Sequence, residues 1–111
     1  MVTLAKARQM ALALPEATEQ DHHGMNSFRV RNKVFATVPD GHHVRVMVDE
    51  PEILAAAEDP SSCEPFYWGK RLACVVVNLR TVRVEMLREL LTEAWLRKSP
   101  KSLARTLLDE G

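Results

Sequence analysis

The sequence predicts an α+β fold, with helices packed against an antiparallel sheet in the order α-β-β-β-α-β-α-α. Helically spaced apolar residues occur near both ends of the chain, valine alternates with arginine between residues 27 and 48, and one valine-rich run lies near residue 75. A chain of 111 residues can form one hydrophobic core and is shorter than the length at which cores divide. We therefore expect one domain over residues 1–111.

The first element is predicted to be a helix over residues 4–14. Thr3 is a suitable N-cap, and four apolar residues follow at helical spacing, namely Ala7, Met10, Ala11 and Leu14. Pro15 then ends the helix. The next stretch, residues 16–26, is polar and contains a glycine and two histidines, so we expect a loop there.

Three strands are predicted between residues 27 and 48. Phe28 and Val30 alternate with Arg29 and Arg31, which is the period-two pattern of a strand with one wet face. The alternation continues after an Arg-Asn-Lys turn and again after the turn at residues 39–42, where proline and glycine favour chain reversal. These segments predict an antiparallel meander that carries arginines on one face.

The second half of the chain is predicted to add a short helix, a buried strand and two helices. Asp49 or Glu50 can cap the helix over residues 51–58, and residues 58–65 are rich in turn formers. The run Leu72–Leu79 is apolar and valine-rich, so we expect a strand buried on both faces inside the sheet. Apolar spacing then predicts a helix over residues 83–97 and a last helix that begins after Ser99.

Composition and charge exclude several classes of protein. No window reaches the roughly 18 uninterrupted apolar residues of a membrane span, and the N-terminal apolar stretch is interrupted by Arg8 and Gln9, so we expect a cytoplasmic protein. Cys63 and Cys74 fit no metal or redox motif and are expected to be free thiols. The formal net charge is zero, yet residues 1–65 carry ten acids against six Lys/Arg, and residues 66–111 carry five against nine.

No catalytic motif is visible. The sequence has no nucleophile elbow, phosphate-binding loop, dinucleotide fingerprint or zinc quartet, so we expect neither an enzyme nor a cofactor or metal. The histidines occur as two adjacent pairs, residues 22–23 and 42–43. A metal site that takes one histidine from each pair with Asp21 or Asp40 is conceivable, but solvated loop histidines are the simpler interpretation.

Two groups of cations are candidate phosphate ligands. The first is the arginine-bearing face of the meander, with Arg29, Arg31 and Arg45, joined by Lys33. The second crosses from one helix into the next and comprises Arg97, Lys98, Lys101 and Arg105. A solvated face explains the first group equally well, and the helix dipole accounts for Arg97 and Lys98 without a ligand.

The most unusual stretch is residues 65–71, in which Phe66, Tyr67 and Trp68 precede a glycine, Lys70 and Arg71. Aromatic rings beside cations can stack nucleic-acid bases or anchor a protein partner. Alternatively, two of the rings fill the core while Tyr67 or Trp68 stays at the surface. The stretch is expected to be irregular or to form the start of a strand.

Several segments, in this order and spacing, resemble the MmcQ/YjbR-like family of small bacterial proteins over almost the whole chain. They are ALPEATEQ, SFRVRNKVFATV, VRVMVDEPE, PFYWGKRLACVVVNL and LRELLTEAWLRKSPKSLARTL. The family's recurrent positions fall here on Pro15, Glu16, Phe28, Lys33, Phe35, Pro51, Lys70 and the Ala94–Trp95 pair. Many relatives have a tryptophan near position 72, where this chain has Leu72.

The resemblance implies a YjbR-like α+β fold and a function commonly labelled DNA binding. From it we expect non-catalytic phosphate contacts by six cations, Arg29, Arg31, Lys33, Arg45, Lys70 and Arg71. The alternative is a chaperone-like or protein-interaction module with its partner at Phe66, Tyr67 and Trp68.

Overall fold

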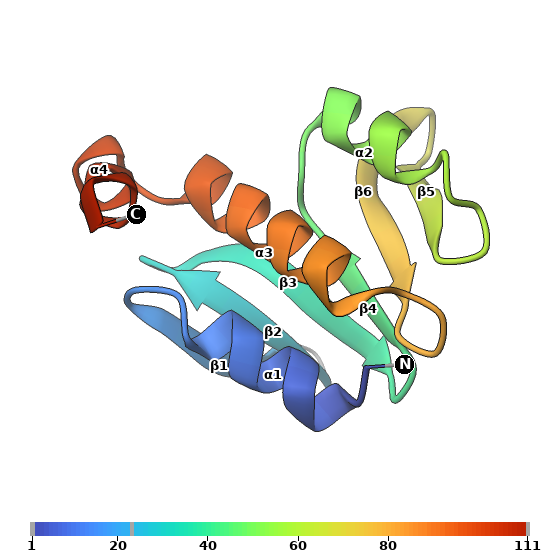
Figure 1. Ribbon diagram of the computed structural model, residues 1–111, viewed down its shortest axis with the longest axis horizontal. Helices are drawn as coiled ribbons and strands as arrows, with labels where there is room; N and C mark the ends of the chain where they lie inside the picture. Colours follow the sequence, from blue (N-terminus) through green and yellow to red (C-terminus); the bar gives the residue numbers. More distant parts are fainter. Residues whose placement is uncertain (1, 23, 111) are drawn as a thin grey trace.

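The computed structural model describes residues 2–22 and 24–110. For residues 22 and 108–110 it describes the backbone only. Within the described residues, six strands form one antiparallel sheet of order β1-β2-β3-β4-β6-β5, accompanied by four helices (Figure 1). The elements are α1 (Leu4–Leu12), β1 (Ala17–His22), β2 (Met25–Val30), β3 (Lys33–Asp40), β4 (His43–Val46), α2 (Glu50–Ala56), β5 (Cys63–Trp68), β6 (Arg71–Asn78), α3 (Val84–Lys98) and α4 (Lys101–Glu110). The predicted α+β class is confirmed.

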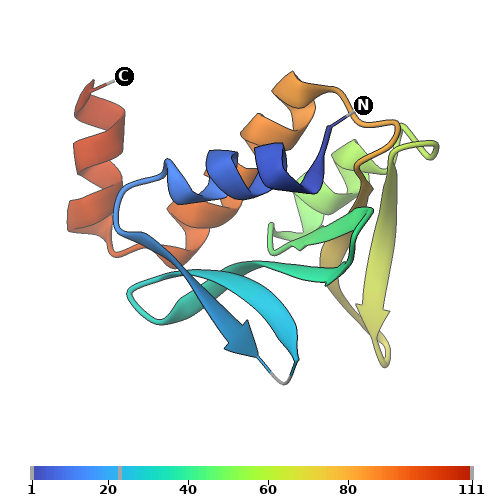
Figure 2. The ribbon, with the colours of Figure 1, turned by 90° about the horizontal axis from the view of Figure 1, so that it is seen from below.

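Three helices cover one face of the sheet. Figure 2 shows α1, α2 and α3 above the strands, while α4 stands beyond the end of α3. The apolar side of α3, with Leu87, Leu91, Ala94 and Trp95, is buried against the sheet. Trp95 also donates a hydrogen bond of 2.9 Å from Nε1 to the carbonyl oxygen of Pro15, which ties α3 to the end of the α1 segment. No helix in the described part of the chain is long and apolar enough to span a membrane.

The predicted loop at residues 16–26 is wrong, because most of it forms β1 and the start of β2. β1 pairs with β2 from Ala17 opposite Val30 to His22 opposite Met25. It is an edge strand with largely wet side chains, so its sequence carries no apolar alternation. Backbone hydrogen bonds to β2 hold it in place, and these have no signature in the sequence.

The aromatic stretch also forms a strand. β5 pairs with β6 from Cys63 opposite Val77 to Trp68 opposite Arg71, and it forms the other edge of the sheet. The predicted valine-rich strand is β6, which lies inside the sheet between β4 and β5 as expected. Val75 and Val77 are fully buried under the helices, whereas Val76 on the opposite face is only partly buried.

The second face of the sheet faces away from α1, α2 and α3, and we call it the open face. Val44 and Val46 belong to the core, so Arg45 between them points to the open face. One row of cross-strand neighbours on this face reads Ser27, Thr37, Arg45, Val76, Glu64. The predicted arginine-bearing face of the meander is this open face.

Candidate functional site

The six candidate cations do not form one surface. Arg29 and Arg45 lie on the open face, while Arg31, Lys33, Lys70 and Arg71 lie in or beside two hairpin turns. The β2–β3 turn and the β5–β6 turn are at the same end of the sheet, because β3 and β6 both pair antiparallel with β4 and therefore begin at the same end. Four of the six cations are thus at this end.

A cation from the helical layer joins this end of the sheet. Lys98 is the last residue of α3, and burial together with the nearby charges of Arg97, Lys33 and Arg71 lowers its pKa. Cations influence one another in this way only over short distances. Lys98 therefore lies within electrostatic reach of Lys33 at the start of β3 and of Arg71 at the start of β6. We call the set Lys33, Lys70, Arg71 and Lys98 the basic end.

Arg97 is beside the basic end but has a structural role. Its Nη1 donates to the carbonyl oxygens of Met47 and Val48, at 2.9 and 3.3 Å. These contacts hold the end of α3 against the segment that follows β4. Lys101 and Arg105 are exposed on α4. The second group of cations in the sequence is therefore divided: Arg97 stabilises the fold and Lys98 belongs to the basic end.

The charge of Arg31 is already paired. Its Nε donates to Glu16 Oε1 at 2.6 Å, and its Nη2 donates to Oε2 at 3.0 Å. This hydrogen-bonded pair raises the pKa of Arg31 and lowers the pKa of Glu16. The other two ion pairs among the described residues are Arg8 with Glu19 and His43 with Asp40. None of the three uses a member of the basic end.

The arginines of the open face make contacts within the sheet. Arg45 places its guanidinium 4.6 Å from the centre of the Phe66 ring, a cation–π contact with the neighbouring hairpin. Arg29 donates from Nε to Ser27 Oγ at 3.1 Å. Both side chains are only partly exposed. In contrast, the side chains of Lys33, Lys70 and Arg71 at the basic end are exposed to solvent.

Two aromatic rings stand at the surface next to the basic end. Tyr67 is 56% exposed and Trp68 is 74% exposed, whereas Phe66 is partly buried under Arg45. Gly69 follows with a φ of 65°, the left-handed conformation that glycine adopts readily and that allows the chain to turn into β6. The expectation that two of the three rings fill the core is wrong, since both Tyr67 and Trp68 stay at the surface and only Phe66 is partly buried.

The two cysteines are free and buried, as predicted. Burial and the charge of Asp59 raise the pKa of the Cys63 thiol to about 11. Burial also raises the pKa of Cys74, with a smaller opposing effect from the charge of Arg45. Because the thiolate is the nucleophile, neither side chain is activated at neutral pH.

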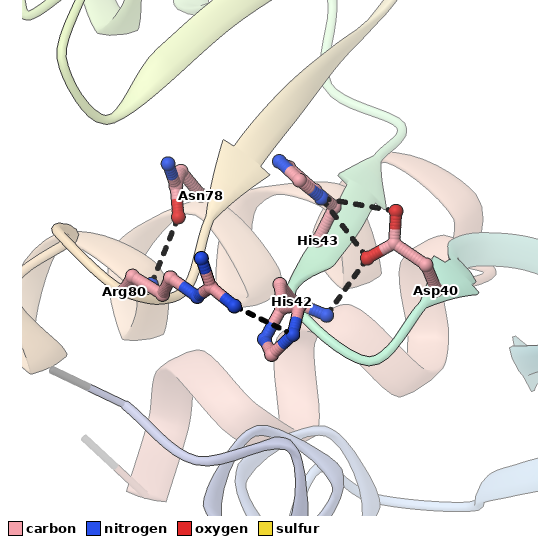
Figure 3. Close-up of polar contacts among 5 residues, drawn as sticks. All are labelled: Asp40, His42, His43, Asn78 and Arg80. Carbon is pink, nitrogen blue, oxygen red and sulfur yellow. Dashed lines mark hydrogen bonds and ion pairs between the residues drawn. The ribbon is translucent and has the colours of Figure 1, made fainter.

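The described histidines belong to the opposite end of the sheet (Figure 3). Asp40 accepts from the backbone N–H of His42 at 2.7 Å and contacts His43 Nδ1 at 2.9 Å, which together lower the pKa of Asp40. Arg80 Nη2 lies 2.9 Å from His42 Nε2. These contacts stabilise the β3–β4 turn. His23 and the side chain of His22 lie outside the described residues, and the rest contain no group of three metal-ligating side chains.

The surface hollows lie among the helices. One of about 310 Å³ between α1 and α3 is lined by Lys6, Met10, Leu14 and Arg88, among others. Another of about 300 Å³ beside Arg97 is lined by Asp49, Glu52 and Glu93, which disfavour an anion. The basic end does not line either of these two hollows, and three of its four side chains, Lys33, Lys70 and Arg71, are exposed.

The fold and this site together define a small α+β protein with a six-stranded sheet, in which Lys33, Lys70, Arg71 and Lys98 take part in none of the three ion pairs found among the described residues. The sequence model of the YjbR family matches residues 12–97, so the chain belongs to the YjbR family. Among solved structures, the crystal structure of Deinococcus radiodurans protein DR2400, with the family-model domain DUF419, has a TM-score of 0.77 and 24% identity. The match covers 96% of this chain and 88% of that chain, and it supports the fold. No curated protein is significantly similar to the chain.

Proposed function

We propose that the protein binds DNA without catalysis, through phosphate contacts made by the basic end. The observation that supports this most is that Lys33, Arg71 and Lys98 come from three separate elements and take part in no ion pair found among the described residues. Burial lowers the pKa of Lys98, and the charges of Arg97, Lys33 and Arg71 reach it and lower it further. Like charges repel, so a stable fold gains nothing from bringing them together. Phosphate oxygens would relieve this repulsion by supplying the missing negative charge.

The expected binding is weak, salt-dependent and largely independent of base sequence. If the four cations of the basic end neutralise four phosphates, log K should fall against log salt with a slope of about −3.6 on duplex DNA. Affinity should then fall about 150-fold between roughly 50 and 200 mM salt. The neutral net charge limits the attraction to this one surface. Such a partner would place the protein in the cytoplasm, as the sequence predicts.

Arg29, Arg31 and Arg45 are not needed for this proposal. Arg31 is paired with Glu16, and Arg45 is stacked on Phe66. Arg29 is already engaged with Ser27. Of the six cations predicted from the sequence, Lys33, Lys70 and Arg71 remain in the proposed interface, and Lys98 joins them.

The test is fluorescence anisotropy with labelled duplex and single-stranded DNA at two salt concentrations. We expect the triple variant Lys33→Gln, Arg71→Gln, Lys98→Gln to lose most of the affinity and most of the salt dependence. The matched control is Lys6→Gln, Arg88→Gln, which removes exposed cations from the α1–α3 side and should leave binding unchanged.

Stability provides a second control in the same experiment. Because burial and neighbouring cations lower the pKa of Lys98, replacing it should not reduce stability. A triple variant that is fully folded by circular dichroism and still binds as the native protein does would refute the proposal. Absence of binding by the folded native protein at low salt would refute it as well.

The alternative function is a protein-interaction module. The exposure of two adjacent rings, Tyr67 and Trp68, favours it, because aromatic side chains are frequent anchors at protein interfaces. It would be supported if DNA failed to bind and substitution of these rings abolished association with a purified partner.

A further inference from the structure

We infer that the tip of the β5–β6 hairpin is a stacking surface for unpaired bases, so that the basic end prefers single-stranded over duplex nucleic acid. This inference is based on the position of the exposed Trp68 ring, which lies opposite Arg71 in the hairpin and beside Lys70. The inference rests on the proposed function and adds to it the class of nucleic acid that is bound.

The exposure of the two rings is the first observation. Among the described residues, three large hydrophobic side chains are exposed, namely Leu54, Tyr67 and Trp68. Two of the three are consecutive and stand at a hairpin tip, while the other tryptophan, Trp95, is fully buried. Aromatic surface left in water costs free energy that a partner would recover. The position of these rings beside cations indicates what that partner is.

The register of the hairpin is the second observation. Trp68 lies opposite Arg71, and residues directly opposite in an antiparallel pair share one side of the sheet. Tyr67 lies opposite Leu72, which packs against the core, so Tyr67 is on the other side. The indole of Trp68 and the side chain of Arg71 therefore leave the hairpin on the same side, from paired positions. A base on the Trp68 ring would place its backbone phosphate within reach of Arg71.

Lys33 and Lys98 extend this pair into a path. Burial lowers the pKa of Lys98, and the charges of Lys33 and Arg71 reach Lys98 and add to this effect. A strand that stacks one base on Trp68 can place a phosphate on Arg71 and then pass over the end of the sheet to Lys33 and Lys98, which lie on the side covered by the helices. Proteins that bind single strands without sequence preference combine these two features, a stacking ring and a row of cations.

Duplex DNA cannot use the ring in the same way. Its bases are stacked on one another and offer only their edges in the grooves. A hairpin tip that carries a bulky indole would contact a duplex through phosphates alone. Single-stranded nucleic acid exposes the faces of its bases, so it gains the stacking in addition to the phosphate contacts.

The test uses the intrinsic fluorescence of the protein. We would titrate the native protein with an oligothymidine single strand and with a mixed-sequence duplex of equal length, at low salt. The emission of Trp68 should be quenched by the single strand and not by the duplex, while Trp95 is buried and should not respond.

Three variants separate the contributions of the Trp68 and Tyr67 rings to single-strand binding. Trp68→Ala should weaken single-strand binding between about 5- and 150-fold and leave duplex binding unchanged. Trp68→Phe should retain part of the preference because it keeps a ring, and Tyr67→Ala should have the smaller effect because that ring faces away from Arg71. In Trp68→Ala, the remaining Trp95 emission reports that the core is intact.

The outcomes separate this inference from the proposed function. Salt-dependent duplex binding without a single-strand preference, or equal losses on both probes in Trp68→Ala, would overturn the stacking surface and leave DNA binding standing. Failure of both probes to bind the folded protein at low salt would overturn both. A single-strand preference that Trp68→Ala removes supports the inference.

Discussion

Trp95→Phe tests the contact that joins the two ends of the chain. Trp95 is fully buried, and its Nε1 donates a hydrogen bond of 2.9 Å to the carbonyl oxygen of Pro15, eighty residues away in sequence. Phenylalanine keeps an aromatic ring in the core but removes the donor and part of the volume. The Pro15 carbonyl then loses its partner beneath α3.

The expected loss of unfolding free energy is about 2–4 kcal/mol. Leaving the part-buried Pro15 carbonyl without its donor costs about 1–3 kcal/mol, and the space left by the smaller ring adds about 1 kcal/mol. For a domain of this size, such a loss lowers the melting temperature by about 8–16 °C. The measurement is urea and thermal unfolding followed by far-ultraviolet circular dichroism.

The matched control is the same substitution at the other tryptophan, Trp68→Phe. Trp68 is 74% exposed, so its replacement should change the unfolding free energy by less than about 0.5 kcal/mol. If Trp95→Phe cost less than about 1 kcal/mol, or no more than Trp68→Phe, the hydrogen bond to Pro15 would not be what anchors α3 to the first part of the chain.

Two further predictions concern acid stability and thiol reactivity. The hydrogen bond from Arg31 lowers the pKa of Glu16, so the pair stabilises the fold above the ordinary carboxyl pKa and is lost as the pH falls through the lowered value. Glu16→Gln should therefore reduce the fall in urea midpoint between about pH 6 and 3, and an unchanged fall would contradict this. Cys63 and Cys74 should not react with a thiol reagent at pH 8 until the protein is unfolded in urea, because both are buried and burial raises the pKa of each thiol. Rapid reaction of the folded protein would refute that interpretation.

Much of the fold was predictable because its signals are local. The Thr3 cap accepts a hydrogen bond from the backbone N–H of Lys6, as the first helix requires. The Arg-Asn-Lys turn forms with Arg31 and Asn32 at positive φ, which matches the tight hairpin that joins β2 to β3. Each of these features depends on residues a few positions apart, so the sequence pattern is sufficient to indicate them.

The strand β1 was predicted as a loop, and the aromatic part of β5 was predicted only as an irregular stretch or the start of a strand, for the same physical reason. β1 and β5 have one pairing neighbour each and hold polar or aromatic residues where an inner strand has aliphatic ones. What makes them strands is hydrogen bonding to β2 and β6, and the period of their side chains does not record it. The recurrent positions Pro15 and Trp95 are another such case, since their hydrogen bond joins residues far apart in the chain.

The amino-acid sequence alone determines the class of the fold, the helices, the Thr3 cap, the inner strands and the free thiols. It indicated six candidate cations without separating Lys33, Lys70 and Arg71 from the other three, and the cap predicted at Asp49 makes no side-chain hydrogen bond. Only the tertiary structure decided which charges act together. It paired Arg31 with Glu16, laid Arg45 on Phe66, and brought Lys98 within electrostatic reach of Lys33 and Arg71. Electrostatic interactions depend on distance in space, and the antiparallel sheet with α3 lying across it sets those distances between residues that are remote along the chain.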